Sequence, residues 1–228
     1  SDRPAARRAS SAVTITGSTM ADAMRVFLAV DLGDAMSGAG HAWGQAVAGT
    51  LGPAASALTW VPPARIHVTL RFFGELPVDR VDAVAQALTA ASWSPAFEIG
   101  FGDGGTYPPS GRPRVLWLGI STGRDALVSL HDALGHRLAG AGGGIASTGT
   151  AGAGAGDVFS PHVTIARVRR DPPPGLGRAL RDACARTPPP DARAAVHELT
   201  LFQSVLKSRG PAYVPLVRVP LVAAAASG

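Results

Sequence analysis

A tetrapeptide that occurs twice constrains the fold of this 228-residue chain more than any other feature. Residues 67–70 read HVTL and residues 162–165 read HVTI, so both copies have the pattern His-Val-Thr-aliphatic. Polar and apolar residues alternate in each copy, as they do in a strand with one buried face. Successive side chains of a strand point to opposite faces. We therefore expect one strand to present His67 and Thr69, and a second to present His162 and Thr164, over an open surface.

Hydrophobic patterning around these strands predicts an α+β protein. Apolar periodicity indicates strands at 25–32, 65–73, 96–101, 114–120, 162–168, 196–206 and 212–222. It also indicates four helices: one that ends near 48, one that begins near Asp79, one that carries the leucines of 127–138, and one that spans 175–186. Strands follow one another directly as well as alternating with helices, which favours α+β over a doubly wound parallel sheet. No glycine-rich phosphate loop follows a strand, which argues against a dinucleotide site.

The patterning also divides the chain. Residues 1–23 are polar and unpatterned, and we expect a disordered extension or an expression remnant there. Residues 24–222 read as a single domain, interrupted at 139–156 by a flexible Gly/Ala-rich loop, and residues 223–228 read as a tail.

Composition excludes several classes of protein. Apolar residues make up 46% and charged residues 16%, which excludes wholesale disorder. The single cysteine, Cys184, excludes an internal disulfide framework, and its place on a leucine-bearing helical stripe predicts a buried thiol. The long uncharged stretches are broken by Gly and Pro and do not resemble membrane spans, so we expect a soluble, cytoplasmic monomer without a membrane partner.

The charge is basic, at +5, and 20 of the 21 basic residues are arginine. The planar arginine side chain suits phosphate. A GC-rich genome also favours arginine over lysine, so the composition alone leaves an anionic partner and a coding bias equally open.

The paired motif favours acid–base chemistry over other kinds of site. Zinc sites need three or four ligands, and two histidines with two threonines do not provide them. A serine nucleophile is unsupported because no Gly-x-Ser-x-Gly elbow is present. Near neutral pH, one imidazole can accept a proton while a second donates one. Two such groups on opposite sides of a phosphodiester suit displacement at phosphorus, with threonine hydroxyls on the non-bridging oxygens.

These residues resemble the RNA 2′,3′-cyclic phosphodiesterases, also called 2′-5′ RNA ligase-like proteins, of the two-histidine (2H) phosphoesterase superfamily. The resemblance runs from RVFLAVDL through WVPPARIHVTLRFFGEL, PRVLWLGI and FSPHVTIARV to LTLFQSVLKSRGPAYVPL. It implies a bilobal fold, with two antiparallel or mixed sheets and flanking helices around a central cleft. It also implies hydrolysis of RNA or nucleoside 2′,3′-cyclic phosphate ends to 2′-phosphomonoesters, without a metal or another cofactor.

The resemblance further implies individual roles. His67 would donate a proton to the leaving O3′, His162 would accept one from water, and Thr69 and Thr164 would hold the phosphate. Arg167 matches a basic residue that often follows the second motif, although strict alternation removes it from the His162 face unless a bulge intervenes. A pair of ordinary histidines would give a bell-shaped pH dependence centred near neutrality.

Some alternatives stay open at this point. The same groups could run a 2′-5′ phosphodiester ligase or hydrolase, with a ribose hydroxyl in place of water. A third possibility is a non-catalytic RNA- or nucleotide-binding module on the same fold, which would not require both histidines. Phe72, Tyr107 and Trp117 are either core aromatics or platforms for a base, and burial tendencies favour the core.

Overall fold

The computed structural model describes residues 23–139, 159–208 and 210–223. The expected N-terminal extension up to residue 22, the Gly/Ala-rich loop beyond Ala139 and the tail from residue 224 lie outside these ranges. The strands are β1 (Ala23–Asp31), β2 (Leu58–Trp60), β3 (His67–Pro77), β4 (Phe97–Tyr107), β5 (Val115–Thr122), β6 (His162–Val168), β7 (Arg193–Val196), β8 (Glu198–Lys207) and β9 (Gly210–Pro220). The α-helices are α1 (Gly33–Leu51), α2 (Val78–Thr89), α3 (Arg124–Leu138) and α4 (Leu176–Arg186), and 3-10 turns occupy Gly52–Ala57 and Pro63–Arg65.

The strands of the described residues form one curled sheet with the order β7-β4-β5-β6-β3-β1-β8-β9, and β2 pairs with β6 beside β3. Every pairing between these strands is antiparallel. The two sheets expected from the sequence are therefore two halves of one sheet. They join at β3 and β6 through a single residue pair, Val68 with Val163. The α+β class is confirmed.

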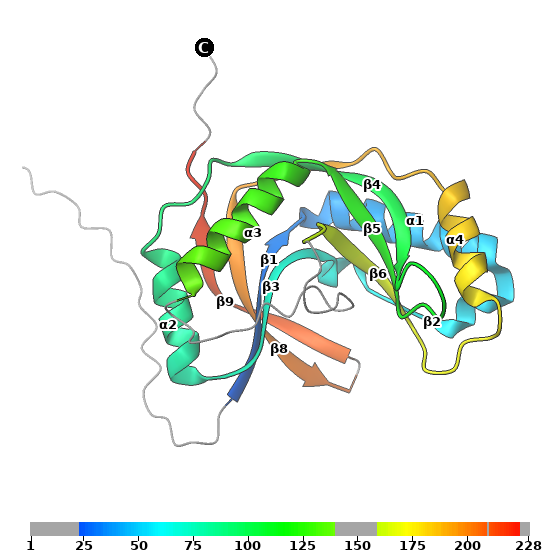
Figure 1. The fold of residues 1–228 in the computed structure, drawn as a ribbon, viewed down its shortest axis with the longest axis horizontal. Coiled ribbons are helices and arrows are strands. Elements are labelled where there is room, and N and C mark those ends of the chain that lie inside the picture. Colours follow the sequence, from blue (N-terminus) through cyan, green and yellow to red (C-terminus); the bar gives the residue numbers. More distant parts are fainter. Residues whose placement is uncertain (1–22, 140–158, 209, 224–228) are drawn as a thin grey trace, which may run out of the picture.

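Each half of the sheet has its own pair of helices (Figure 1). Helices α2 and α3 pack against the half that contains β3, β1, β8 and β9, and α1 and α4 pack against the half that contains β6, β5, β4 and β7. The leucine stripe of α3 is fully buried, as its spacing predicts. The two motif strands, β3 and β6, consequently lie in the middle of the molecule, one in each half.

Helix α1 contacts β6 closely because of its glycines. A Cβ on Gly44 would lie 2.6 Å from Cγ2 of Ile165, and one on Gly40 would lie 3.1 Å from the ring of Phe101. These two glycines lie on one face of the helix, one turn apart. Glycine has a low helix propensity, but at these two positions it allows α1 to pack closely against β6, the strand of the second motif.

The sequence missed two short strands and truncated a third. Leu58–Trp60 and Arg193–Val196 are too short to show a period, so the sequence pattern indicates no strand at either segment. Strand β4 extends to Tyr107 rather than ending at 101, because Gly104 and Gly105 are strand residues here. A Cβ on Gly105 would lie 2.5 Å from the ring of Trp117, so the strand needs glycine at this position to accommodate that ring.

Candidate active site

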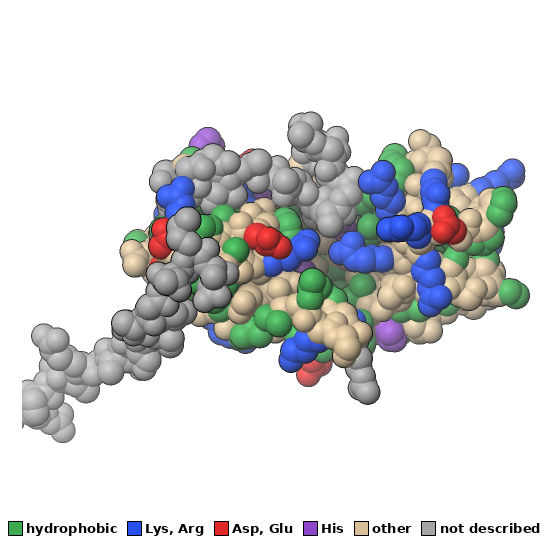
Figure 2. Space-filling model, turned by 90° about the horizontal axis from the view of Figure 1, so that it is seen from below, with side chains coloured by type: hydrophobic (Ala, Val, Ile, Leu, Met, Phe, Trp, Pro, Cys, Tyr) green, Lys and Arg blue, Asp and Glu red, His purple; other side chains and the backbone are tan. Residues whose placement is uncertain are grey.

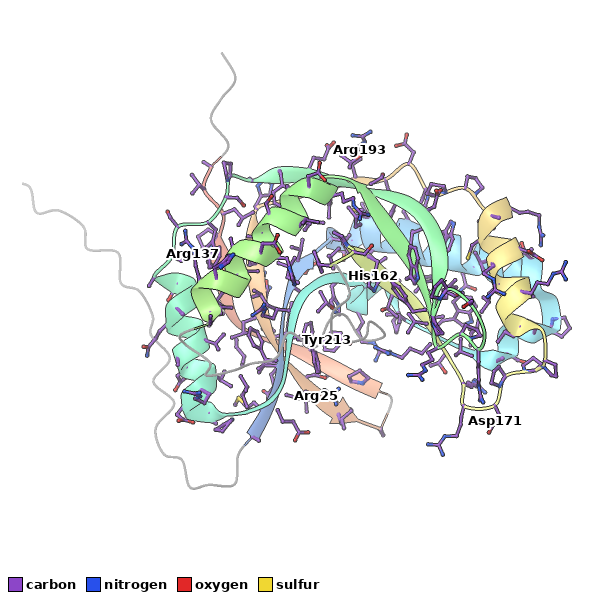
Figure 3. The ribbon with its side chains drawn as sticks, viewed as in Figure 1. Arg25, Arg137, His162, Asp171, Arg193 and Tyr213 are labelled. Atoms are coloured by element: carbon purple, nitrogen blue, oxygen red, sulfur yellow. The ribbon has the colours of Figure 1, made fainter. Side chains whose placement is uncertain are left out.

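The two motifs face each other across the junction of the two halves. Val68 pairs with Val163 in an antiparallel register, so continuing this register places His67 across from Thr164 and Thr69 across from His162. The arrangement is close to two-fold symmetric. Figure 3 shows His162 and Tyr213 near the centre of the molecule, where the halves meet.

A cavity of about 130 Å³ lies at this junction and receives side chains from both motifs. All four motif residues line it: His67, Thr69, His162 and Thr164. The remaining lining residues are Thr59, Trp60, Val61, Arg65, Arg167, Pro211 and Tyr213. The structure thus brings together every site residue that was predicted from the sequence.

Both imidazoles are held in the same tautomer. Nδ1 of His67 lies 2.9 Å from the carbonyl oxygen of Arg65, and Nδ1 of His162 lies 2.8 Å from the carbonyl oxygen of Ser160. A carbonyl can only accept a hydrogen bond, so each Nδ1 carries a proton and donates it. Nε2 is then the atom of each neutral ring that can accept a proton, or release one when the ring is charged.

Aromatic rings pack against each histidine. The His67 ring stacks on Phe27 at 4.9 Å between centroids and meets the edge of Tyr213 at 5.2 Å. The His162 ring lies 5.1 Å from Tyr107 and 6.0 Å from Trp117, which stack on each other. These contacts fix the orientation of both imidazoles and remove water from one side of each.

Burial lowers the pKa of both histidines below the ordinary value. The pKa of His67 falls to about 4, mainly because the ring is desolvated, and the nearby positive charge of Arg167 acts in the same direction. The Arg65 carbonyl and the carboxylate of Asp31 act in the opposite direction. Burial likewise lowers the pKa of His162, while the Ser160 carbonyl opposes the change. Both rings are therefore neutral in the free protein at pH 7.

Arg167 reaches the cavity because β6 is irregular. The register with β5 shifts between Leu116 and Trp117 and leaves Ile165 as an extra residue in β6. Ile165 and Ala166 are consecutive and both buried, whereas strict alternation would expose one of them. The shift turns Arg167 to the side of His162. This is the bulge that Arg167 requires if it is to lie on the same face as His162.

A similar irregularity corrects the expectation for Phe72. Strict alternation places Phe72 on the side of Val68, away from His67. In the structure Leu70 is an extra residue in β3, so Phe72 pairs with Phe27, the ring that stacks on His67. Phe72 therefore lies on the His67 side, beneath the guanidinium of Arg25, and outside the cavity lining.

Sequence reasoning assigned no role to six residues of the cavity: Thr59, Trp60, Val61, Arg65, Pro211 and Tyr213. Trp60 lies on β2, Arg65 lies in the 3-10 turn before the first motif, and Tyr213 lies on β9. The Arg65 guanidinium donates to the carbonyl of Pro211 at 3.0 Å, which ties the first motif to β9. The position of Arg65 two residues before His67 was the one available signal.

Cys184 is not among the residues that line this cavity. Cys184 on α4 is buried, and burial raises its pKa to about 11, so the thiol stays protonated. Within 23–139, 159–208 and 210–223, no three His, Cys, Asp or Glu side chains are placed to hold a metal ion. In the same ranges no helix is long and apolar enough to cross a membrane.

Comparison with known proteins assigns the family. The family model of the 2′-5′ RNA ligase superfamily matches residues 43–207, which include both motifs. The chain belongs to the 2′-5′ RNA ligase superfamily. Its architecture is also similar to that of Escherichia coli LigT complexed with 3′-AMP, with a TM-score of 0.66 at 25% identity over 88% of this chain and 99% of that one.

Curated relatives within this superfamily have a more specific name. A protein of Archaeoglobus fulgidus called RNA 2′,3′-cyclic phosphodiesterase is 27% identical over 85% of this chain and 98% of its own length. A protein of Aquifex aeolicus with the same name is 29% identical over 68% of this chain and 77% of its own. The resemblance inferred from the paired motifs is thereby confirmed.

Proposed function

We propose that this chain hydrolyses RNA or nucleoside 2′,3′-cyclic phosphate ends to 2′-phosphomonoesters, with His67 and His162 as proton donor and acceptor. The observation that carries the proposal is the matched pair of imidazoles in one cavity. Each has Nδ1 bonded to a backbone carbonyl, and no described residue hydrogen-bonds to its Nε2, the atom that would transfer the proton. The names of relatives that match most of the chain support the same substrate.

The proposed step is an in-line displacement at phosphorus. Nε2 of His162 takes a proton from water as its oxygen attacks, and the bond between phosphorus and O3′ breaks. Nε2 of protonated His67 gives its proton to O3′, so the product has a free 3′-hydroxyl and a 2′-phosphate. After the step His162 is protonated and His67 is neutral. Loss of a proton from His162 to water and gain of one by His67 from water restore the starting state.

Other cavity residues have supporting roles in the proposal. The hydroxyls of Thr69 and Thr164 donate to the non-bridging oxygens, whose charge grows in the transition state. The Arg167 guanidinium adds positive charge near the same oxygens. The phosphodiester anion also favours the charged imidazolium, so the pKa of His67 rises once substrate is bound.

The direct test is to incubate the protein with the four nucleoside 2′,3′-cyclic monophosphates and to identify the product isomer by phosphorus NMR. We expect the 2′-phosphate alone. A 3′-phosphate would place the donor on the other side of the phosphorus atom, and no turnover of these compounds or of a cyclic-phosphate-ended RNA would refute the proposal.

A second candidate is 2′-5′ ligation, which the description of the matching superfamily favours. In that reaction a 5′-hydroxyl of a second RNA replaces water at the same centre. Incubating an RNA that ends in a 2′,3′-cyclic phosphate with one that begins with a 5′-hydroxyl tests it, since ligation yields a 2′-5′ linkage that resists nucleases specific for 3′-5′ bonds.

A further inference from the structure

The positive charge of this chain is concentrated next to the second motif. Residues 159–186 contain six arginines and two aspartates, so this stretch carries +4 of the net charge of +5 of the whole chain. It includes β6, α4 and the loop between them. Figure 2 shows the corresponding cluster of Lys and Arg side chains on one side of the molecule, where α1 and α4 lie.

This cluster is continuous with the cavity. Arg167 lines the cavity, and Arg169 and Arg170 follow it directly where β6 ends. The Arg169 amide donates to the carbonyl of Ala57 at 2.8 Å, which anchors the backbone at this point. All three arginines are exposed. Among the described residues, no carboxylate is in ion-pair contact with any of them.

A shallow groove extends the cluster away from the cavity. The groove has a volume of about 420 Å³ and lies between the loop before β5 and the start of α4. Three of its lining residues are arginines, Arg112, Arg178 and Arg181, and four are prolines: Pro113, Pro172, Pro173 and Pro174. Arg112 pairs with Asp171 at 3.3 Å, which links the two walls.

The loop that carries these groups is restrained before any ligand binds. Proline fixes the backbone angle φ, and residues 172–174 are three consecutive prolines. Less conformational entropy is then lost when the loop binds a partner. Arg167, Arg169 and Arg170 have no ion-pair partner among the described residues, and the apolar surfaces of three prolines follow them. This arrangement fits a polyanion whose phosphates pair with the arginines and whose bases rest on the prolines.

We propose that Arg169, Arg170 and the adjoining groove bind the RNA strand that leads to the cyclic phosphate. This rests on the proposed function, because it extends the substrate from the terminal nucleotide to the nucleotides before it. The strand leaves the cavity past Arg167, its next phosphates pair with Arg169 and Arg170, and the groove takes the nucleotides beyond. A single strand is expected, since the bases must be unpaired to rest on the proline surfaces.

The test compares one short and one long substrate in one pair of variants. R169Q/R170Q removes two charges from the proposed RNA surface, and R124Q/R137Q removes two from α3, which packs on the other half of the sheet (Figures 1 and 3). The substrates are 2′,3′-cyclic CMP and a ten-nucleotide RNA with the same cyclic end. We expect R169Q/R170Q to raise KM for the RNA about tenfold at low salt, and to leave kcat/KM for cyclic CMP unchanged. R124Q/R137Q should alter neither.

Binding measured independently of turnover separates this proposal from the proposed function. The affinity of a labelled ten-nucleotide RNA with a 2′-phosphate end is followed by fluorescence anisotropy as salt increases. Each phosphate contact on a single strand contributes about 0.7 to the slope of log affinity against log salt. R169Q/R170Q should therefore reduce the slope by up to about 1.4, whether or not the protein hydrolyses the cyclic compounds.

Three outcomes would overturn the proposal. The first is an unchanged slope in R169Q/R170Q, the second is an equal loss with cyclic CMP and with RNA, and the third is tighter binding to a duplex than to a single strand. Absence of hydrolysis together with the expected change in slope would refute the proposed function and leave the RNA surface standing.

Discussion

His67 and His162 are neutral in the free protein at pH 7, because burial lowers the pKa of both rings. The optimum pH for kcat/KM is therefore expected below neutrality. The parameter kcat/KM reports the pKa values of the free protein, and the active form has one neutral and one protonated imidazole. The population of that form is largest between the two pKa values. Burial lowers both of them, that of His67 to about 4.

The maximum of kcat/KM should lie below pH 6.5 and should fall as pH rises through the ordinary histidine range, because both rings lose their protons there. The maximum of kcat should lie at higher pH, because the bound anion raises the pKa of the pair. Profiles of both parameters with 2′,3′-cyclic CMP check this, and a kcat/KM maximum at or above pH 7 would contradict it. Since the two histidines flank one phosphate, their titrations are coupled. The two apparent pKa values of each pH profile therefore belong to the pair and not to single residues.

The four motif residues that the sequence identified in the cavity lie in repeated local patterns, and the residues that it missed do not. His67, Thr69, His162 and Thr164 stand out because two local patterns repeat. Tyr213 and Trp60 belong to no repeated pattern, and only the pairing of their strands brings them to the cavity. Long-range pairing of this kind leaves no local signal in one sequence.

The strands and helices were predictable where their period is long enough to read, and irregularities were not. The extra residues Leu70 in β3 and Ile165 in β6 reverse the side on which Phe72 and Arg167 lie. A bulge shifts alternation by one residue, and nothing in the local sequence marks it when apolar residues are consecutive. For Arg167 the bulge brings a predicted residue to the cavity. For Phe72 it overturns the predicted face.

The seating of α1 on β6 gives a prediction about stability. Gly44→Ala places a Cβ where only 2.6 Å separates it from Ile165, so helix and strand must move apart. We expect a loss of about 1–3 kcal/mol in the free energy of unfolding, as for other overpacked sites, measured by urea denaturation.

The matched control lies on the same helix. A Cβ on Gly49 would meet nothing within 4 Å, so Gly49→Ala should stabilise the protein by up to about 1 kcal/mol through helix propensity alone. Equal effects of the two substitutions, in either direction, would show that α1 does not pack on β6 through Gly44.

For the whole molecule, a proposed mechanism confined to two imidazoles gives a prediction about metals. Both proton transfers use groups of the chain itself, and the substrate diester has one formal charge. We expect kcat to be unchanged after dialysis against EDTA and in its continued presence. Loss of turnover that zinc or magnesium restores would contradict the two-histidine mechanism.

The fold places one imidazole from each half of the sheet at the single residue pair where the halves join. Two nearly symmetric imidazoles therefore have opposite roles in the proposed mechanism. His67→Ala and His162→Ala should each lower kcat by about 10² or more, since either loss removes a general acid or base. Circular dichroism should show that both variants retain their fold.

The measurement that tests this assignment most directly replaces O3′ of the cyclic substrate by sulfur. A thiolate leaves without protonation, so the group that donates to the leaving atom becomes dispensable while the group that accepts from water does not. We predict that His67→Ala recovers most of its lost rate with the sulfur substrate and that His162→Ala does not. Recovery of His162→Ala alone would reverse the two roles, and recovery of neither variant would contradict proton transfer by the pair.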